Sequence, residues 1–501
     1  MNPEPLPPEP LYRAADLRAI EAAAVDQPLM QRAGLAAAKL AATLCGDRGA
    51  AILVLAGPGN NGGDALEAAC HLRQRFYEVS VVFTGDASRL PVDAAAAYQR
   101  FLQSGGSTLD SIPENTRCSL IIDGLFGIGL QRDVSGQFAG LVHAANALAA
   151  RDRCPLLALD CPSGLDADTG QQRGATIRAS HTITFIAGKP GLYTGDGPDC
   201  CGEISVAALA LDAARLAAPG GMTIARDLFA AHLQPRARNS HKGSNGNTGI
   251  LGGASSMVGA AFLAGRAALK LGSGRVYIGL LDPQACAFDP MQPELMLRRP
   301  DALFAAQLTA LACGPGMGNS HQATALLEQA CALDLPLVLD ADALNLVAAE
   351  GNLQVALASR SAATLLTPHP TEAARLLGRD TADVQSDRIA AACEMASRYR
   401  AHVALKGCGT IVATPDGRWF VNTTGNPGLA SAGTGDVLTG FITALLAQGW
   451  PAHEALLAAV HLHGTAADEL VAGGIGPVGL SAGELIDSAR ACFNRWINGD
   501  R

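Results

Sequence analysis

Residues 51–76, AILVLAGPGNNGGDALEAACHLRQRF, decide the fold. The short apolar run AILVLA passes through a glycine-rich turn into a longer amphipathic stretch, and a second apolar run, VSVVFTG, follows at 79–85. Strands that alternate with helices in this way form a parallel sheet, because each helix carries the chain back across the sheet. The pattern predicts a doubly wound, Rossmann-like α/β domain.

The alternation continues to about residue 210 and restarts at about residue 248, so the sequence predicts two α/β domains. In the second series TGILGG is followed by a predicted helix over 258–272 and then by GRVYIGLL, LTALACG, PLVLDAD, ATLLTPH and HVALKG. A Pro-Gly-Gly cluster within Asp212–Gly221 interrupts the chain between the two series. We therefore predict domains over residues 11–217 and 222–498.

Composition indicates a globular protein that binds neither nucleic acid nor a membrane. The chain has 501 residues, of which 49% are hydrophobic and 17% charged. Its net charge is −9 and only 4% of its residues are aromatic, so both a cationic surface and stacking platforms for nucleic acid are lacking. The most apolar stretch in the C-terminal third, Val437–Trp450, is too short and too polar to span a bilayer.

Cysteine usage and the N-terminal sequence favour the cytoplasm. The 13 cysteines include no C-x-x-C pair, which argues against a zinc site and against a disulfide framework. The first ten residues, MNPEPLPPEP, are acidic and rich in proline, whereas a signal peptide needs positive charge followed by an apolar core. We expect a cytoplasmic protein.

Glycine and acidic residues follow nearly every predicted strand. In open α/β sheets ligands bind where the loops leave the carboxyl ends of the strands, because helix N-termini and free backbone amides converge there. The first such loop, GPGNNG at 57–62, fits the G-x-G-x-x-G pattern of dinucleotide-binding proteins. The same spacing also occurs in simple tight turns, so the pattern alone leaves both interpretations open.

Oxygen-bearing side chains in three of these loops favour a cation beside an anionic ligand. Asn61, Asp123 and Ser163 each follow a different predicted strand, and together they could hold a monovalent ion. Asp160 or Asp64 would then be free for acid–base chemistry. Each residue has an ordinary alternative as a strand-end cap or a turn residue. Lys189 could contact an anion, although an isolated lysine is more often exposed to solvent.

In the second series GTGD at 433–436 precedes an apolar helical run. Glycines before a helix leave backbone N–H groups free to bind a phosphoryl oxygen, and the helix dipole favours negative charge there. Asp436 is then either a helix cap or a general base that takes the proton from an attacking hydroxyl.

Other motifs narrow the alternatives. Neither a Walker loop nor a G-x-S-x-G elbow is present, which argues against a P-loop enzyme and an esterase. His461 and His463 are two residues apart and point to different faces of a helix, so they are poor joint metal ligands. His369, between two prolines at a strand end, is a better candidate for contact with substrate.

The order of these motifs resembles the family of bifunctional NAD(P)H-hydrate repair enzymes, in which a YjeF-type epimerase domain precedes an ADP-dependent, ribokinase-like dehydratase domain. In the first half the resemblance rests on LMQRAG, GPGNNGGD, DGLFGIGL and DCPSGLDADTG. In the second half it rests on NTGILGGASSMVGAAFLAGRAAL, CGPGMG, PLVLDADALN, TPHPTEAARLLG, KGCGT and GNPGLASAGTGDVLTG. It extends from about Leu11 almost to the C-terminal end.

The resemblance implies a function for each set of residues. In the first domain it implies a potassium site, a hydrate-binding loop pair and a substrate contact near the epimerising carbon; in the second it implies a hydrate site and an adenine-nucleotide site. Asn61, Asp123 and Ser163 would bind potassium; Asn60, Asn61, Gly62, Gly63, Asp64, Gly127, Ile128, Gly129, Leu130, Gln131, Arg132, Asp133 and Asp160 would bind the hydrate in the first domain; Ala260, Gly316, His369 and Asp436 would line the second hydrate site; and Lys406, Gly407, Cys408, Gly409, Thr410 and Gly435 would hold the nucleotide.

The resemblance also implies the chemistry. The first domain would exchange the R and S hydrates of NADH and NADPH. In the second domain the hydroxyl of the S hydrate would attack the terminal phosphoryl group of ADP, and elimination of phosphate would restore NADH or NADPH. Potassium in the first domain, and magnesium with ADP or ATP in the second, are the expected cofactors. We also expect a homo-oligomer, although the motifs do not specify the number of subunits.

Three positions depart from the family pattern, and two other functions remain open. Ala65 replaces a glycine that usually follows GGD, where it could crowd a bound phosphate; the connection from Glu21 to Leu29 is short; and Gln131 cannot act as an acid or base. A ribokinase-like small-molecule kinase with an accessory dinucleotide-binding domain would use the same GTGD motif. A first domain that senses dinucleotides without turnover would bind them in the same way.

Overall fold

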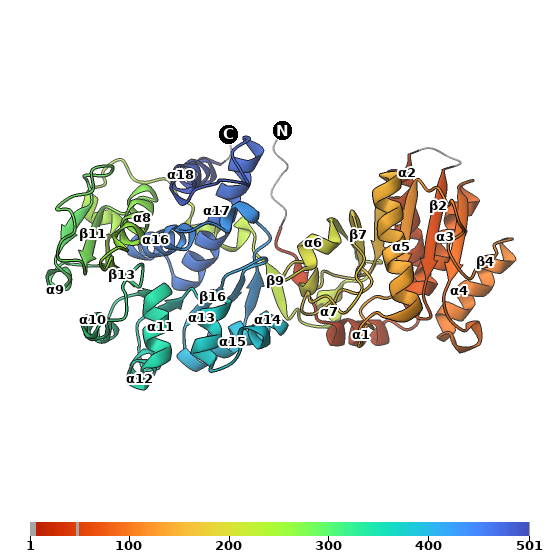
Figure 1. The fold of residues 1–501 in the computed structure, drawn as a ribbon, viewed down its shortest axis with the longest axis horizontal. Coiled ribbons are helices and arrows are strands. Elements are labelled where there is room, and N and C mark those ends of the chain that lie inside the picture. The colour runs from red at the N-terminus through yellow and green to blue at the C-terminus, as the bar shows by residue number, and fades with distance from the viewer. Residues whose placement is uncertain (1–6, 47–49, 500–501) are drawn as a thin grey trace. The chain divides into compact units, whose positions relative to one another are not determined.

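The computed structural model describes residues 7–46 and 50–499. The chain separates into two compact units, one over Glu9–Gly221 and one that starts at Met222 (Figure 1). The division falls where the Pro-Gly-Gly cluster ends. Among the described residues, none of the helices is both long enough and apolar enough to cross a membrane.

The first unit contains the predicted doubly wound sheet, with strand order β4-β3-β2-β5-β6-β7-β8 and parallel neighbours throughout. The order changes direction between β2 and β5, so the loops that leave these strands diverge and open a ligand crevice. The elements are β1 Pro10–Leu11, α1 Ala14–Ala23, α2 Leu29–Cys45, β2 Ala51–Ala56, α3 Asn60–Gln74, β3 Glu78–Phe83, α4 Val92–Gln103, β4 Thr108–Leu109, β5 Leu120–Gly124, α5 Gly136–Asp152, β6 Leu156–Leu159, β7 His181–Phe185, α6 Gly197–Cys201, β8 Glu203–Ala207 and α7 Ala213–Leu216.

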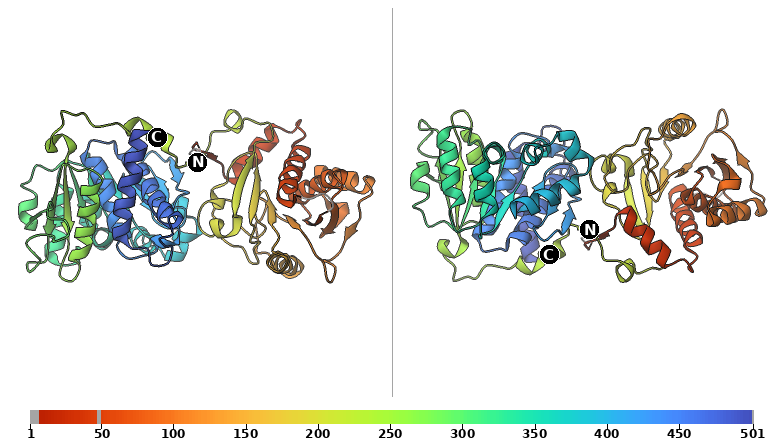
Figure 2. Two further views of the ribbon diagram at one scale, coloured as in Figure 1. Left: turned by 90° about the horizontal axis from the view of Figure 1, so that it is seen from above. Right: turned by 90° about the horizontal axis from the view of Figure 1, so that it is seen from below.

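Helices cover both faces of this sheet, which explains why its central strands are apolar without interruption. In β2, Ile52 and Val54 pack into a core formed with α1 to α4, whereas Leu53 and Leu55 pack into a separate core formed with α5. Figure 2 shows α1 and α2 on one side of the sheet and α5 on the other.

The second unit has a mixed sheet with the order β9-β18-β17-β16-β15-β14-β13-β10-β11-β12. Neighbouring strands are parallel from β16 through β15, β14, β13, β10 and β11 to β12. The predicted strands are confirmed as β10, β11, β13, β14, β15 and β16, whereas β12 and the antiparallel hairpin of β17 and β18 were not predicted. The strands are β9 Gly221–Thr223, β10 Asn247–Gly252, β11 Arg275–Leu280, β12 Met296–Arg298, β13 Ala310–Cys313, β14 Leu337–Leu339, β15 Thr364–Leu366, β16 His402–Leu405, β17 Ile411–Ala413 and β18 Trp419–Val421.

Helices of the second unit include α8, which confirms the helix predicted over 258–272, and the buried α16. The strand order changes direction between β10 and β13, which again opens a crevice at the carboxyl ends of the strands. The helices are α8 Val258–Lys270, α9 Pro300–Leu303, α10 His321–Cys331, α11 Ala341–Ala349, α12 Gly351–Ala358, α13 Pro370–Leu377, α14 Thr381–Ser386, α15 Arg388–Tyr399, α16 Thr434–Ala447, α17 Ala452–Ala472 and α18 Ala482–Asn498.

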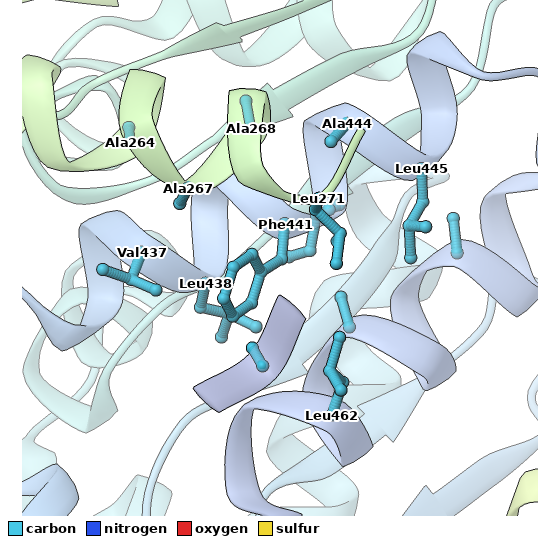
Figure 3. Close-up of a cluster of buried hydrophobic side chains, with 14 of the residues drawn as sticks. Ala264, Ala267, Ala268, Leu271, Val437, Leu438, Phe441, Ala444, Leu445 and Leu462 are labelled. Carbon is cyan, nitrogen blue, oxygen red and sulfur yellow. The ribbon is translucent and has the colours of Figure 1, made fainter. Parts of the chain in front are cut away.

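Helix α16 is fixed by close packing against α8. Its residues Val437, Phe441 and Leu445 join Ala264 and Ala268 of α8 in one apolar cluster (Figure 3). The two helices approach so closely at Gly440 that a Cβ there would lie 2.2 Å from the carbonyl oxygen of Ala264. A helix held so firmly keeps its N-terminal residues in a constant position at the edge of the sheet.

Candidate active sites

In the first unit Asp123, at the end of β5, is joined directly to Ser163, in the loop after β6. The hydroxyl of Ser163 donates to Asp123 Oδ1 at 2.7 Å, and the amide of Ser163 donates to Asp123 Oδ2 at 2.8 Å. Both side chains are fully buried. Burial raises the pKa of Asp123 to about 6, even though these hydrogen bonds lower it. A buried carboxylate of this kind has a strong preference for a nearby cation.

Asn61 supplies a second oxygen at the same strand ends. Its amide nitrogen donates to the carbonyl of Leu159 at 3.1 Å, which fixes the orientation of the side chain. Its Oδ1 is buried and has no hydrogen-bond partner within the described residues. An unpaired buried oxygen costs free energy, so this atom is suited to bind a ligand that is not part of the chain. The donor set of Asn61, Asp123 and Ser163 fits a monovalent cation, which binds to carboxylate, amide and hydroxyl oxygens.

Asp160, which follows β6, forms an ion pair with a buried lysine. Lys189 Nζ lies 2.8 Å from Asp160 Oδ1, and only 1% of the lysine side chain is exposed. Lys189 also donates to the hydroxyl of Thr184 at 2.5 Å. The interpretation of Lys189 as a solvent-exposed residue is wrong, whereas its contact with an anionic ligand stays a prediction. Its anionic partner is a side chain of the same domain.

The loop that begins at Gly127 packs against Asp160. The amide of Ile128 donates to Asp160 Oδ2 at 3.1 Å. A Cβ on Gly127 would lie 2.6 Å from the same oxygen and 3.4 Å from the amide carbon of Asn61, so only glycine fits here. The structure thus brings Gly127 and Ile128 to the site. The rest of the predicted loop extends outward, with exposed side chains at Gln131, Arg132 and Asp133 and with Gly129 and Leu130 between them and the site.

Helix α3 contributes the other residues that the sequence placed at this site. Gly62 and Gly63 are both buried, and a Cβ on Gly62 would lie 2.0 Å from the carbonyl oxygen of Gly57. Asn60, the first residue of the helix, is exposed. Burial raises the pKa of Asp64 well above its ordinary value, and the carboxylate of Asp160 raises it further. Asp64 is therefore the more readily protonated of the acid–base candidates.

Ala65 does not face the glycine-rich loop. It is fully buried in the packing of α3 on the sheet, where its Cβ would lie 2.5 Å from a Cβ on Gly124. The expectation that Ala65 crowds a bound phosphate is wrong, because this side chain points toward strand β5. Glu21 of α1 lies near enough to Asp160 for the two carboxylates to interact, and burial raises its pKa.

In the second unit Asp436 is the third residue of α16. The helix begins after Gly433, whose backbone is left-handed with φ 90°, and no side chain caps its N-terminus. The interpretation of Asp436 as a helix cap is therefore excluded. Burial raises the pKa of Asp436 to about 7, with Asp340 acting in the same direction and Lys406 opposing it. A carboxylate that titrates near neutrality is suited to general-base catalysis.

A buried ion pair lies beside the N-terminus of α16. Lys406 Nζ contacts Asp340 Oδ1 at 2.7 Å, and the hydroxyl of Thr439 donates to Asp340 Oδ2 at 2.9 Å. A Cβ on Gly435 would lie 3.3 Å from Lys406 Nζ. Burial acts to lower the pKa of Lys406, but the combined attraction of Asp340, Glu372 and Asp436 outweighs burial and raises the pKa. A cation and helix amides thus meet where phosphoryl charge would be bound.

The sequence analysis missed Asp340, although the signal was present in LDAD at the end of strand β14. The rest of the predicted nucleotide loop connects β16 with β17. Gly407 has φ 139°, and a Cβ there would lie 2.8 Å from the guanidinium of Arg388. Gly407 and Cys408 are exposed, whereas Gly409 and Thr410 are partly buried. This open loop beside Lys406 is accessible to a nucleotide.

His369 lies at the start of α13, where its Nδ1 accepts from the amide of Thr371 at 3.1 Å. Its Nε2 lies 3.3 Å from Glu372 Oε1, and 47% of its side chain is exposed. Burial and the charge of Lys406 lower the pKa of His369, so the imidazole is neutral at neutral pH. His369 can therefore cap its helix and contact a ligand.

Ala260 and Gly316 meet at the change of strand direction. A Cβ on Gly316, whose φ is 57°, would lie 3.3 Å from the Cβ of Ala260 and 2.6 Å from the carbonyl oxygen of Met257. The two buried histidines are structural: His463 Nε2 pairs with the carbonyl of Thr434 at 2.9 Å, and burial lowers the pKa of His461 to about 4. Within residues 7–46 and 50–499, the side chains of His, Cys, Asp and Glu form no cluster of three suited to a metal ion.

Comparisons with known proteins agree with this geometry. A family model described as YjeF-related protein N-terminus matches residues 26–191, and one described as NAD(P)H-hydrate dehydratase matches residues 248–487. The bifunctional NAD(P)H-hydrate repair enzyme of Vibrio cholerae is 38% identical over 86% of each chain, and that of Escherichia coli is 36% identical over 98% of this chain and 95% of its own. The crystal structure of a Bacillus subtilis ADP/ATP-dependent NAD(P)H-hydrate dehydratase, co-crystallised with ATP and Mg²⁺, is 32% identical, with a TM-score of 0.48 over 55% of this chain and 98% of that one.

The fold and its two sites define a fusion of a Rossmann-like YjeF-type domain with a ribokinase-like dehydratase domain. The chain belongs to the family of bifunctional NAD(P)H-hydrate repair enzymes.

Proposed function

We propose that the chain restores hydrated NADH and NADPH in two steps. The epimerase domain, over residues 11–217, exchanges the R and S hydrates, and the dehydratase domain, over residues 222–498, converts the S hydrate and ADP into NAD(P)H, AMP and phosphate. One observation carries the proposal most directly. Asp436, at the open N-terminus of α16, titrates at about 7 beside the Lys406–Asp340 pair.

In the dehydratase site Asp436 accepts the proton of the substrate hydroxyl while that oxygen attacks the terminal phosphoryl group of ADP. AMP leaves with the electrons of the broken P–O bond. The amides at the start of α16 and the Lys406 ammonium stabilise the negative charge on the transferred group. Loss of phosphate from the ring and of a proton from the neighbouring carbon then re-forms the double bond.

Magnesium bound with the nucleotide would neutralise phosphoryl charge, as it does in other phosphoryl-transfer enzymes. Mg²⁺ commonly takes most of its ligands from phosphates and water, which suits a site where three clustered His, Cys, Asp or Glu side chains are lacking among the described residues. Lys406, Gly407, Cys408, Gly409, Thr410 and Gly435 would bind ADP or ATP. Ala260, Gly316 and His369 would line the hydrate site next to Asp436.

In the epimerase site Asn61, Asp123 and Ser163 would hold potassium. The ion supplies positive charge next to the anionic dinucleotide. Exchange of the two epimers requires that the C–O bond at the hydroxyl-bearing carbon break and re-form on the opposite face. The departing hydroxyl takes up a proton and the returning water gives one back, and Asp160 is the residue to which we assign this proton transfer. Lys189 holds the Asp160 carboxylate in place. Asp64, with its raised pKa, remains the second acid–base candidate.

The test is complete conversion of a mixture of hydrates. The full chain is incubated with R and S NADH hydrates, ADP, Mg²⁺ and K⁺, and the appearance of NADH is followed by its absorbance. Both epimers should be consumed, and AMP should form in equal amount to NADH. No consumption of the S hydrate would contradict the proposal, and a stable phosphorylated product would indicate a kinase instead.

The cellular setting is part of the same proposal. The cysteine usage of the sequence, 13 residues without a C-x-x-C pair, supports a reducing compartment such as the cytoplasm. Association into a homo-oligomer stays a prediction, and sedimentation equilibrium of the full chain measures it.

A further inference from the structure

A cleft of about 450 Å³ opens at the edge of the second sheet, outside the residues assigned above. It is lined by Gly318 and Asn319 in the loop after β13, by Asp342 and Asn345 of α11, and by Arg375 of α13. These elements follow β13, β14 and β15, which are neighbours in the sheet. The cleft therefore lies at the carboxyl ends of the strands, where ligands of α/β proteins bind.

The cleft lies near the site of Asp436. Gly318 is two residues after Gly316. His369 is the N-cap residue of α13, the helix that carries Arg375. The charge of Asp342 acts on the pKa of Asp436, and the charge of Arg375 acts on that of His369. A ligand held at Asp436 can thus extend into this cleft.

The polar groups of the cleft match two parts of a dinucleotide. Arg375 is held by a hydrogen bond from its Nη1 to Asn345 Oδ1 at 2.7 Å, and its guanidinium is otherwise exposed toward solvent, so it can bind a phosphate oxygen pair. Asp342 accepts from the amide of Gly318 at 2.8 Å. A carboxylate and an amide oxygen in one cleft are suited to the hydroxyl groups of ribose.

The strand order sets the direction of the substrate. The nucleotide loop follows β16, Asp340 beside Asp436 follows β14, and the cleft lies over β13 to β15. When ADP occupies the β16 side and the hydrate's hydroxyl lies at Asp436, the remainder of the dinucleotide extends over β13 to β15, where the cleft lies. This remainder carries a pyrophosphate and a second ribose.

We propose that this cleft binds the pyrophosphate and adjoining ribose of the hydrated dinucleotide, with Arg375 as the phosphate contact and Asn345 as the residue that orients it. The inference rests on the proposed dehydratase function and names a further specificity determinant for that substrate. The inference requires that Arg375 contribute to the binding of dinucleotide hydrates and have little effect on the binding of a substrate without phosphate.

The experiment compares two substrates in two variants of the full chain. Arg375→Gln is assayed with S NADH hydrate and with the hydrate of reduced nicotinamide riboside, which has the same ring and no phosphate. Arg379→Gln, which removes an exposed arginine paired with Glu394, is the matched control. We expect Arg375→Gln to raise KM for NADH hydrate about ten-fold or more, with kcat little changed. KM for the riboside hydrate should stay within about two-fold of that of the unchanged chain.

Two results would overturn the inference: an unchanged KM for NADH hydrate, or an equal loss with both substrates. An equal loss would show that Arg375 acts through the fold. Absence of turnover by the unchanged chain would contradict the proposed function instead, and calorimetric titration with NADH then decides the inference separately. In this titration one component of NADH binding should be weaker in Arg375→Gln than in Arg379→Gln. Identical isotherms for the two variants would overturn the inference.

Discussion

Lys189 Nζ lies 2.8 Å from Asp160 Oδ1, and the lysine side chain is almost completely removed from solvent. The other oxygens around the ammonium, those of Thr184, Phe185 and Ala187, are neutral. The carboxylate of Asp160 therefore balances the buried charge, and Lys189 in turn holds the Asp160 carboxylate in place. This mutual dependence makes Lys189 a positioning residue for the first site.

The first prediction concerns Lys189→Met. Breaking a buried ion pair by removing one partner costs about 3–5 kcal/mol, so the melting temperature of the first unit should fall. Without the ammonium the Asp160 carboxylate loses the contact that holds it in place, and epimer exchange should fall about a hundred-fold. Exchange is measured by chromatography of the two hydrates.

The double variant Lys189→Met/Asp160→Asn separates stability from chemistry. It removes both charges, so much of the lost stability should return while exchange stays low. Wild-type exchange in the folded Lys189→Met protein would show that the ion pair has no role in the reaction.

The second prediction concerns Gly127, where a Cβ would lie 2.6 Å from Asp160 Oδ2. Gly127→Ala must displace either the loop or the carboxylate, so exchange should fall about ten-fold or more. Gly140→Ala on α5 is the matched control, because a Cβ there meets no atom within 4 Å. Equal rates in the two variants would show that this close approach is not needed for exchange.

The third prediction concerns potassium and Asp123. Potassium should raise the melting temperature of the first unit relative to choline at equal ionic strength, since an ion that binds only the folded protein stabilises it. The pKa of Asp123 is about 6, so the carboxylate is charged above that pH and the effect should fade as the pH drops below 6.

Asp123→Asn should abolish the potassium effect, and Asp110→Asn, at an exposed position, should leave it intact. A shift of equal size in Asp123→Asn would exclude Asp123 as a ligand.

The sequence predicts residues at strand ends well because their position follows from the fold alone. Asn61, Asp123 and Ser163 lie at the carboxyl ends of β2, β5 and β6, which are adjacent strands of the parallel sheet. The hydroxyl of Ser163 donates a hydrogen bond to Asp123. Asp436 is similarly defined by a glycine-rich turn before an apolar helix. In both units the hydrophobic pattern that predicts the strands also predicts where their carboxyl ends meet.

The residues that the sequence did not reveal depend on contacts between distant segments. Lys189 lies 29 positions from Asp160, and Asp340 is 66 positions from Lys406. The ion-pair partner of each residue cannot be read from its own segment, because the burial that gives these charged residues their roles comes from tertiary packing. Arg375 belongs to the same group, since its cleft is formed by three separate segments.

The fourth prediction concerns the pH dependence that Asp436 imposes on dehydration. Its pKa of about 7 means that the base form is lost below neutrality, so kcat/KM should fall about ten-fold per pH unit well below 7. Asp436→Asn should reduce dehydration about a thousand-fold at every pH, while epimer exchange in the first unit continues. Asp334→Asn, at an exposed position, is the control for loss of one negative charge.

The same carboxyl group should lower stability at alkaline pH. Its folded pKa of about 7 exceeds its ordinary value of about 3.9, so the folded state holds a proton that the unfolded state has lost between these limits. Stability of the second unit should therefore decline as the pH rises from about 4 to 7. Asp436→Asn should melt at a higher temperature than the unchanged chain at pH 8, and the difference should shrink toward pH 4 in thermal scans. If Asp436→Asn melts at a higher temperature and loses dehydration, the chain retains a buried charge for catalysis at the expense of stability. A lower melting temperature of this variant at pH 8 would mean that contacts other than those described stabilise the carboxylate.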